Sequence, residues 1–460
     1  MPVHNTSIAP DFQLCQRAEL ANLARSFRGR CGFPRAFHAP MLLDGPAGKR
    51  YRATACTIDI VPGTIVQPVP MLDFSRQYTS LRQEILDAIT QVCDSQGFIL
   101  GPRVAAFEAS AAVACGASFA VGCASGTDAL WLALAAAGIG DSASATRTAH
   151  PVDAVVTSPF SFFASASCIL RAGARPLFAD IDPLTFNLSP QSVADVLRTP
   201  AAANVKAILP VHLYGQCADM DALAKLQCDH PVLRIVEDAA QAFGATWNGR
   251  PAGSLGAAAA FSFYPTKNLA ACGDAGLMTT SDAAIANHAK SLRLHGMTRR
   301  YYHDEVGWNS RIDAIQAAVL DIKLRHLPQW NQQRRNHAAR YAELFRAASL
   351  AAPAASTSTQ DGIVLPYTDP RATHIFHQYV IRAPRRDALR EHLAANHIGS
   401  EIYYPVPIHL QAAMKDLGYQ PGDFPHAETA AAEVLALPMY PELREDEQQS
   451  VVESIRSFYA

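Results

Sequence analysis

The chain has 460 residues, of which 49% are hydrophobic and 17% are charged. This composition can form a large core, excludes wholesale disorder and allows two or three domains. With 39 basic and 41 acidic residues the formal net charge is −2, which argues against a general nucleic-acid binder or a protein that binds acidic membranes. No apolar run reaches the roughly 20 residues that span a bilayer.

Ten cysteines are scattered along the chain. None belongs to a C-x-x-C pair, and no cysteine–histidine cluster has the spacing of a zinc site. Scattered cysteines in a long, alanine-rich chain are typical of reduced side chains that behave as small buried hydrophobes. We therefore expect a cytoplasmic protein without a metal site.

The first 70 residues differ from the rest. They contain eight basic and four acidic residues, and only Arg17–Ser26 has the periodicity of a short helix. No apolar segment of a secretory signal is present. Organised sequence begins at Met71, so we interpret residues 1–70 as a disordered extension or an incorrectly assigned start. A targeting or regulatory arm is the alternative.

From Met71 onward, helical and strand-like segments alternate. The runs predicted to be strands are Phe119–Cys123, Ala154–Thr157, Pro176–Ala179, Ala207–Val211, Val232–Val236, Ala258–Phe263 and Gly276–Thr280. The segments predicted to be helices are Ser80–Ser95, Arg103–Cys115, Asp128–Ala137, Ser161–Arg171 and Pro190–Leu197. This alternation predicts an α/β fold with a mainly parallel sheet, covered by helices on both faces. The polar segment 141–153 is typical of a surface insertion.

The pattern changes after about Pro328. A long helix is predicted over Gln329–Ala347, and after a Ser/Thr/Pro/Ala-rich loop a strand is predicted over Gln378–Arg382. Another helix, a proline-rich stretch and two closing helices complete the chain. We therefore predict a large α/β domain over residues 71–327 and a smaller C-terminal α+β domain over residues 328–460.

The segment Phe261-Ser-Phe-Tyr-Pro-Thr-Lys267 is the most informative for chemistry. Pro265 ends the predicted strand, so Lys267 lies on a tight connection at its carboxyl end, where α/β sheets collect their ligands. A partly desolvated lysine has a lowered pKa and can attack a carbonyl carbon to form a Schiff base. Taken alone, Lys267 would more simply be a surface lysine.

Three other strand ends carry complementary groups. A carboxylate at Asp238 could keep a pyridinium nitrogen protonated, or simply cap a helix. At Gly126 and Thr127 a strand leads into an alanine-rich helix, whose N-terminal N–H groups attract anions and where a hydroxyl can assist. Phe162 could stack on a flat ring or belong to the core. Together these groups match what pyridoxal phosphate (PLP) needs: an anion site, a stacking face, an acid and an amine.

From about Met71 to the C-terminus, the chain resembles the DegT/DnrJ/EryC1/StrS family of PLP-dependent sugar-nucleotide aminotransferases. The matching segments are S-G-T-D-A-L at 125–130, A-D-I-D-P-L-T-F-N at 179–187, P-V-H-L-Y-G-Q at 210–216, E-D-A-A-Q-A at 237–242, F-S-F-Y-P-T-K-N-L at 261–269 and G-W-N-S-R-I-D-A-I-Q-A-A at 307–318. The resemblance implies the aspartate-aminotransferase-like fold, PLP fold type I.

The resemblance also implies roles for individual residues. Lys267 would form the Schiff base with the cofactor, Asp238 would pair with its pyridine nitrogen, and Gln241 would lie beside the ring hydroxyl. Gly126, Thr127 and Ser262 would bind the phosphate, and Phe162 would stack on the ring. Asn309 would reach the phosphate of the neighbouring subunit's cofactor, which implies a homodimer with shared active sites. The residues expected around the sugar nucleotide are His212, Tyr214, Tyr302, His303, Arg311, Tyr404 and His409, although His212 could instead brace the sheet edge.

The implied reaction transfers an amino group from L-glutamate to a keto-sugar nucleotide, as in surface-polysaccharide or secondary-metabolite biosynthesis. Segments 125–130 and 301–311 favour C3 of a dTDP- or UDP-linked 3-keto sugar over C4 of a 4-keto sugar. Family members that act as sugar 3-dehydratases carry histidine in place of the Schiff-base lysine, which disfavours that reaction here. A non-catalytic PLP-binding regulatory protein is a further alternative. Such a protein would be expected to have lost a catalytic residue, whereas this chain keeps both Lys267 and Asp238.

Overall fold

The computed structural model describes residues 68–140 and 152–460, together with two short N-terminal strands. These strands, β1 (Leu42–Asp44) and β2 (Arg50–Arg52), pair antiparallel within a unit that is separate from residues 66–460. Three predictions concern residues that lie wholly or mainly outside the described part. They are the disordered extension over 1–70, the helix over Arg17–Ser26 and the surface insertion over 141–153.

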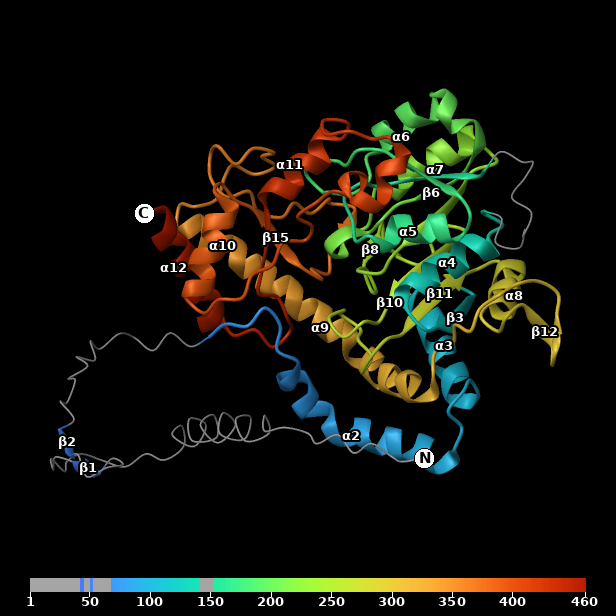
Figure 1. The fold of residues 1–460 in the computed structure, drawn as a ribbon, viewed down its shortest axis with the longest axis horizontal. Coiled ribbons are helices and arrows are strands. Elements are labelled where there is room, and N and C mark those ends of the chain that lie inside the picture. Colours follow the sequence, from blue (N-terminus) through green and yellow to red (C-terminus); the bar gives the residue numbers. More distant parts are fainter. Residues whose placement is uncertain (1–41, 45–49, 53–67, 141–151) are drawn as a thin grey trace, which may run out of the picture. The chain divides into compact units, whose positions relative to one another are not determined.

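A seven-stranded sheet lies at the centre of the larger unit (Figure 1). Its strands are β3 (Phe119–Cys123), β4 (Ala154–Thr157), β5 (Arg175–Phe178), β6 (Val205–Leu209), β7 (Arg234–Asp238), β10 (Ala258–Ser262) and β11 (Gly276–Thr280), in the spatial order β3-β11-β10-β7-β6-β4-β5. Strand β11 pairs antiparallel with β3 and β10, and all the other neighbouring strands of this sheet pair parallel. The predicted mainly parallel α/β sheet is confirmed, with every predicted strand displaced by at most two residues.

Helices on both faces make the sheet a buried layer, as its apolar strands require. The helices of this part are α2 (Phe74–Ser95), α3 (Pro102–Ala114), α4 (Gly126–Ala136), α5 (Ala164–Arg171), α6 (Pro190–Leu197), α7 (Met220–Asp229) and α8 (Ala283–Leu292). Helix α4 packs on β10 and β11 and is buried along nearly its whole length, because no charged residue follows Asp128 in it. This central position holds the N-terminus of α4 at the edge of the sheet.

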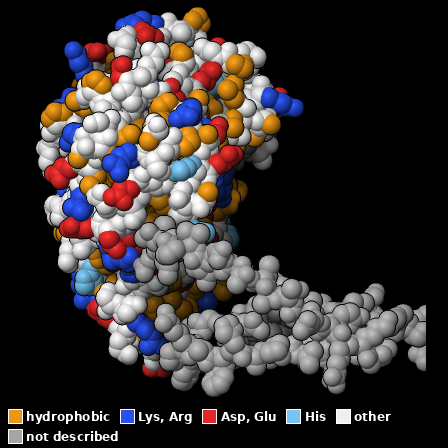
Figure 2. Space-filling view, turned by 90° about the vertical axis from the view of Figure 1, so that its left-hand side faces the viewer, with side chains coloured by type: hydrophobic (Ala, Val, Ile, Leu, Met, Phe, Trp, Pro, Cys, Tyr) orange, Lys and Arg blue, Asp and Glu red, His pale blue; other side chains and the backbone are white. Residues whose placement is uncertain are grey.

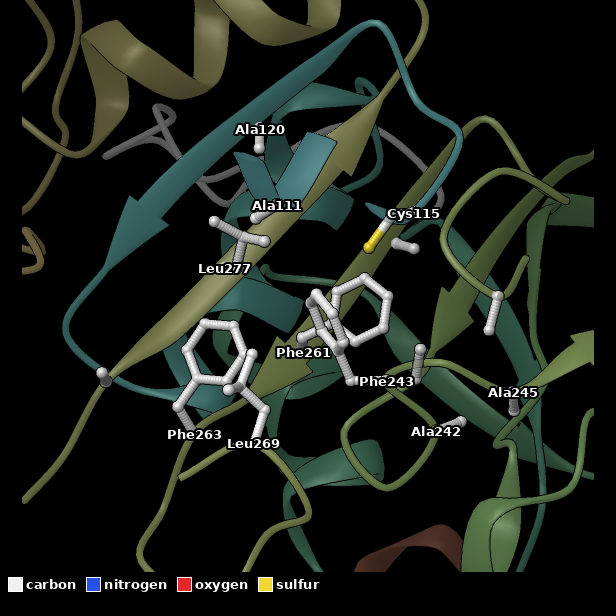
Figure 3. Packing of buried hydrophobic residues seen from close by; sticks show 14 of the residues in the cluster. Ala111, Cys115, Ala120, Ala242, Phe243, Ala245, Phe261, Phe263, Leu269 and Leu277 are labelled. Atoms are coloured by element: carbon white, nitrogen blue, oxygen red, sulfur yellow. The ribbon is translucent and has the colours of Figure 1, made fainter. Parts of the chain in front are cut away.

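Side chains of β10 alternate between two hydrophobic cores, one on each face of the sheet. Ala259 and Phe261 belong to one core, and Ala258 and Ala260 belong to the other. Figure 3 shows the first core, where the ring of Phe261 lies 4.9 Å from that of Phe243, centroid to centroid, in an edge-on arrangement. This packing fixes the end of β10 and the turn that follows it.

The long helix α9 (Ala314–Ala347) begins well before the predicted start at Gln329. That prediction was wrong because Pro328 was taken as the helix boundary. A proline removes one intrahelical hydrogen bond, and α9 accommodates it within a helix that packs against α2, α3 and α12 (Glu445–Tyr459). The expected division at residues 327/328 therefore falls inside a continuous helix.

The C-terminal part has its own two-stranded sheet, β15 (Tyr379–Arg382) with β16 (Val434–Leu437), and its own hydrophobic clusters. Helices α10 (Arg386–Ala395) and α11 (Pro425–Glu433) accompany it. The remaining short elements are β8 (Thr246–Trp247), β9 (Arg250–Pro251), β12 (Met297–Arg299), β13 (Tyr302–His303), β14 (Ala372–Thr373) and 3-10 turns at Pro200–Asn204, Leu213–Gly215, Ile408–Leu410 and Ala412–Leu417.

The chain enters this fold before Met71. Val69 is buried and pairs with the segment around Ile398: its N–H donates to the His397 carbonyl at 3.0 Å, and its carbonyl accepts from the Gly399 N–H at 2.8 Å. The organised part of the chain thus includes the residues just before Met71.

The surface carries charges of both signs. Figure 2 shows basic and acidic side chains interspersed over the face that it displays, in keeping with the small net charge of the chain. Within the described residues, no helix is both long enough and apolar enough to cross a membrane. Nor do three or more His, Cys, Asp or Glu side chains gather there in a way that could hold a metal ion.

Candidate active site

The carboxyl ends of three strands, β3, β7 and β10, bring the main predicted residues to one edge of the sheet. Gly126 begins α4 directly after β3, Asp238 ends β7 and Ser262 ends β10. Lys267 follows Ser262 in a turn that its own N–H closes by donating to the Tyr264 carbonyl at 2.8 Å. Ligands of parallel sheets bind at this edge, so the fold positions an acid, an amine and a helix N-terminus around one site.

Lys267 and Asp238 perturb each other's ionisation. Burial lowers the pKa of the Lys267 ammonium to about 8, although the negative charge of Asp238 works against this shift. Burial raises the pKa of Asp238 above its ordinary value, opposed by a hydrogen bond from Ser165, the Ala240 N–H and the charge of Lys267. An amine that is partly neutral near pH 8, close to a buried carboxylate, is typical of a functional site.

The first turn of α4 and the end of β10 form a narrow cradle. A Cβ added at Gly126 would lie 2.5 Å from the Cβ of Ser262, so only glycine permits this close approach. The Ser125 hydroxyl accepts from the Asp128 N–H at 3.1 Å, whereas the N–H groups of Gly126 and Thr127 have no acceptor among the described residues. Two free N–H groups and nearby hydroxyls fit a phosphate group.

Aromatic and amide groups gather around Tyr404, close to Asp238. Phe162 is 58% exposed, and its ring centroid lies 6.1 Å from that of Tyr404. Gln241 donates from Nε2 to the Tyr404 hydroxyl at 3.1 Å and accepts the Tyr214 N–H at 2.7 Å. The hydroxyl of Tyr214 in turn donates to the Tyr403 carbonyl. The C-terminal part thus holds the Gln241 amide beside an accessible aromatic ring, as a flat, polar-edged cofactor requires.

Two histidines that were expected near the sugar nucleotide are occupied inside the protein. His212 is fully buried, with Nε2 donating to Glu237 at 3.0 Å and Nδ1 accepting from the Ala218 N–H at 3.1 Å. These contacts favour the bracing role over a contact with substrate. His409 is also buried, and its Nε2 lies 3.2 Å from Glu428.

Four further predicted residues, three expected around the sugar nucleotide and one at the neighbouring subunit's cofactor, are exposed or half-buried. Tyr302 and His303 form β13 of a hairpin, with the Arg299 guanidinium 3.6 Å above the Tyr302 ring and His303 Nδ1 2.9 Å from the His295 carbonyl. Asn309 is exposed and Arg311 is half-buried. Within the described chain, no hydrogen bond or ion pair joins these four predicted residues to Lys267 or Asp238.

Sequence reasoning missed Ser165. The residue lies at the start of α5, and its hydroxyl donates to Asp238 Oδ2 at 2.7 Å. The one local signal in the sequence is a pair of serines, Ser161 and Ser165, which lie one helical turn apart after a strand. The partner lies 73 residues away along the chain, and only the fold brings the two together.

Ser310 was also missed. Its hydroxyl accepts the Ala124 N–H at 3.3 Å and donates to Asp128 Oδ2 at 3.0 Å, so it bridges the two ends of the turn that leads into α4. Asp128 also accepts a hydrogen bond from Arg171 at 2.6 Å, and the Arg171 guanidinium lies 5.4 and 5.5 Å from the ring centroids of Trp131 and Trp308. The cradle is therefore fastened to the segment that carries Asn309.

Known proteins resemble this chain in sequence and in fold. Residues 79–456 match the model of the DegT/DnrJ/EryC1/StrS aminotransferase family. The chain belongs to this family. The family resemblance, the α/β fold and the aminotransferase assignment made from the sequence are thereby confirmed, and the aminotransferases of this family depend on PLP.

Relatives in the family have several names. A protein of Geobacillus stearothermophilus named as a pleiotropic regulatory protein is 46% identical, over 85% of this chain and 98% of its own. UDP-N-acetyl-3-dehydro-alpha-D-glucosamine 3-aminotransferase of Acidithiobacillus ferrooxidans is 40% identical over 84% of this chain and 97% of its own. The crystal structure of S. venezuelae DesV in complex with a ketimine intermediate is 40% identical, with a TM-score of 0.77 over 85% of this chain and 98% of that chain. Further relatives are named as transaminases of dTDP-linked amino sugars.

Proposed function

We propose that the protein transfers an amino group from L-glutamate, through PLP held by Lys267, to a dTDP- or UDP-linked 3-keto sugar. The observation that carries this proposal is the site at the sheet edge. There the half-buried Lys267 and the buried Asp238 lie beside an anion cradle that a Cβ at Gly126 would fill. Relatives that are named as 3-amino-sugar transaminases support C3 as the position of transfer.

Each residue of the site has a task that its environment supports. PLP, when bound, supplies an electron sink and a carbonyl carbon that accepts and returns the amino group. Lys267 holds the cofactor covalently at Nζ and, with a pKa near 8, can also accept and return a proton there. Asp238 holds a proton on the ring nitrogen, and the Gly126 and Thr127 N–H groups bind the phosphate.

We also propose that the active enzyme is a homodimer. Asn309 and the β12–β13 hairpin present exposed polar and aromatic side chains that no contact in the described chain joins to the catalytic pair. A second subunit would place them over the partner's site, beside the sugar nucleotide.

Two other functions fit less well. A sugar 3-dehydratase of this family would carry histidine where this chain has Lys267. A purely regulatory PLP-binding protein, which the name of the Geobacillus relative brings to mind, needs neither a lysine with a lowered pKa nor a buried acid beside it. A C4 aminotransferase of a 4-keto sugar nucleotide keeps the same catalytic residues and is separated only by experiment.

The test starts from protein loaded with pyridoxamine phosphate. Dilute UDP- or dTDP-linked 3-keto and 4-keto sugars are added separately, and stopped-flow absorbance follows the return of the yellow, lysine-bound cofactor. The proposal expects rapid return with a 3-keto sugar and slow return with a 4-keto sugar, with no return in Lys267→Ala. Faster return with 4-keto sugars would move the reaction to C4, and no return with any keto sugar would contradict the transaminase proposal.

A further inference from the structure

The two carboxylate oxygens of Asp238 accept hydrogen bonds from different donors, and one donor is the buried hydroxyl of Ser165. Asp238 Oδ1 accepts the Ala240 N–H at 3.2 Å, and Oδ2 accepts the Ser165 hydroxyl at 2.7 Å. Ser165 is 1% exposed and Asp238 is 4% exposed, so water does not compete for this contact. Hydrogen bonds to an ionised carboxylate are short and stronger than those between neutral groups.

A second serine fixes the direction of that hydrogen bond. Ser161 Oγ lies 2.8 Å from Ser165 Oγ, and it too is buried. A hydroxyl has one proton to give, and the carboxylate of Asp238 can only accept while it is ionised. Ser165 therefore donates to Asp238, and Ser161 donates to Ser165. The two serines form a short chain of hydrogen bonds that ends on the carboxylate.

We propose that Ser165 is a positioning residue for the proposed transamination, which keeps the Asp238 carboxylate ionised and oriented toward the ring nitrogen of the cofactor, with Ser161 supporting it from behind. This inference rests on the proposed function. Ser165 touches neither substrate nor cofactor in this account and acts through Asp238 alone.

The physical consequence concerns a shared proton. Each hydrogen bond that stabilises the ionised carboxylate lowers its affinity for a proton, so the proton stays on the ring nitrogen. Without Ser165 the carboxylate becomes more basic, and the proton moves from the ring nitrogen toward Asp238. The ring then carries less positive charge, withdraws electrons less strongly and repels a second positive charge on the Lys267 nitrogen less strongly.

Other ionisable groups around Asp238 set the background for any pH effect. They are Lys267 after β10, His212 after β6, Tyr404 from the C-terminal part and Cys168 on α5. Burial keeps the pKa values of Tyr404 and Cys168 well above their usual range, so neither titrates near neutral pH. The Ser165 substitution alters none of these groups, which keeps the comparison clean.

The experiment compares Ser165→Ala with Ser158→Ala, both in the PLP-loaded full-length chain. Ser158 is a buried serine just after β4, and among the described residues its hydroxyl bonds only within its own turn, donating to the Phe160 carbonyl at 3.2 Å and accepting the Phe160 N–H at 3.0 Å. Three quantities are measured: the pH midpoint at which the absorption band of the bound cofactor changes, and kcat and KM for L-glutamate. Ser165→Thr, which restores a hydroxyl, is the rescue variant.

Ser165→Ala is expected to raise the pH midpoint and to lower kcat about tenfold, the effect of one hydrogen bond to a charged group, with little change in KM. Ser165→Thr should recover most of kcat, and Ser158→Ala should match the unsubstituted protein. A midpoint and a kcat in Ser165→Ala equal to those of Ser158→Ala would overturn this inference alone. An unsubstituted protein that takes up no PLP would overturn the proposed function, and this inference with it.

Discussion

The ammonium group of Lys267 is subject to two opposing effects. Burial favours the neutral amine and lowers its pKa to about 8, whereas the nearby carboxylate of Asp238 favours the charged form. An ordinary lysine has a pKa near 10.4, so at neutral pH the Lys267 amine is far more available as a nucleophile than a surface lysine. This difference supplies the reactivity that covalent capture of an aldehyde needs.

This balance predicts a pH dependence in the cofactor-free protein. Because only the neutral amine reacts, the rate at which PLP forms its yellow adduct should rise with pH and level off above about 8. Asp238→Asn removes the charge that favours the ammonium, so the midpoint should move to lower pH. Stopped-flow absorbance between pH 6 and 10 measures both, with Lys267→Ala as the control without adduct. A midpoint that rises in Asp238→Asn would contradict the assigned electrostatics.

At the residue scale, the sequence predicts those residues whose role follows from their immediate neighbours in the chain. Lys267 follows a proline that ends a strand, and Asp238 ends an apolar run, so both were placed at the sheet edge before the structure was known. Ser165 could not be found in this way. Its function depends on a contact with β7 that arises only when α5 and β7 are packed into one fold.

Among the secondary-structure elements, α4 owes its exact placement to two supports. Its apolar body lies against β10 and β11, and its first turn is bridged by Ser310 between Ala124 and Asp128. The N–H groups of that turn are the proposed phosphate ligands, so their direction depends on the bridge.

Ser310→Ala should therefore weaken cofactor binding. The substitution leaves the Ala124 N–H without its acceptor and Asp128 without one donor, a loss that should raise the dissociation constant for PLP about tenfold. Fluorescence titration of the cofactor-free protein measures the constant. The control is Ser291→Ala on α8, whose buried hydroxyl has no partner among the described residues. Equal PLP affinity in the two variants would show that Ser310 does not hold the cradle.

Secondary-structure elements were predicted correctly where the local hydrophobic pattern determines them. The prediction failed where contacts between helices determine the start of an element. The seven short apolar runs were found because buried parallel strands read as continuous hydrophobic segments. The start of α9 was missed because Pro328 is an unfavourable helix residue in isolation, yet contacts with α2, α3 and α12 sustain the helix through it.

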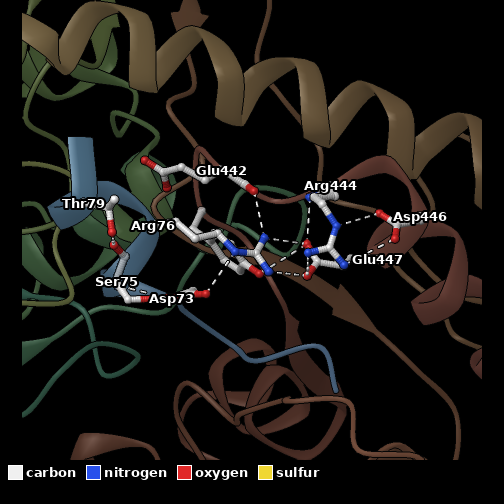
Figure 4. Close-up of polar contacts among 9 residues, drawn as sticks. Asp73, Ser75, Arg76, Thr79, Glu442, Arg444, Asp446 and Glu447 are labelled. Carbon is white, nitrogen blue, oxygen red and sulfur yellow. Dashed lines mark hydrogen bonds and ion pairs between the residues drawn. The ribbon is translucent and has the colours of Figure 1, made fainter. Parts of the chain in front are cut away.

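At the scale of the whole molecule, a charged cluster joins α2 to α12 (Figure 4). The Arg76 guanidinium donates to both oxygens of Glu447, at 2.8 and 2.5 Å, and pairs with Asp73 at 3.0 Å. The Glu447 side chain is only 2% exposed. Burial alone would raise the pKa of Glu447, but hydrogen bonds from Arg76 and the Arg444 N–H outweigh it and hold the pKa below its usual value.

Arg76→Ala should therefore destabilise the fold, because it leaves a carboxylate buried with fewer partners. The expected loss is about 3 kcal/mol at pH 7. Arg325→Ala, which breaks an exposed pair with Glu84, should cost less than about 1 kcal/mol. Urea unfolding, followed by circular dichroism, gives both values.

The pH dependence gives a second check on the same pair. A carboxylate whose pKa is lowered by folding stabilises the protein above its unfolded value of 4.5, and this contribution is lost as pH falls through the folded value. The difference in free energy of unfolding between the unsubstituted protein and Arg76→Ala should thus be largest at neutral pH and should shrink in acid. A difference that stays constant from pH 7 to pH 4 would contradict this account of Glu447.

The measurement that tests the central claim most directly is the absorption spectrum of PLP-loaded protein before and after addition of L-glutamate. The account predicts a yellow band that depends on Lys267 and fades to the pyridoxamine form as the amino group is taken from glutamate. Lys267→Ala should show no such lysine-bound band. A band that L-glutamate leaves unchanged would contradict the proposed donor, and a protein that stays colourless with added PLP would contradict the assignment of the site itself.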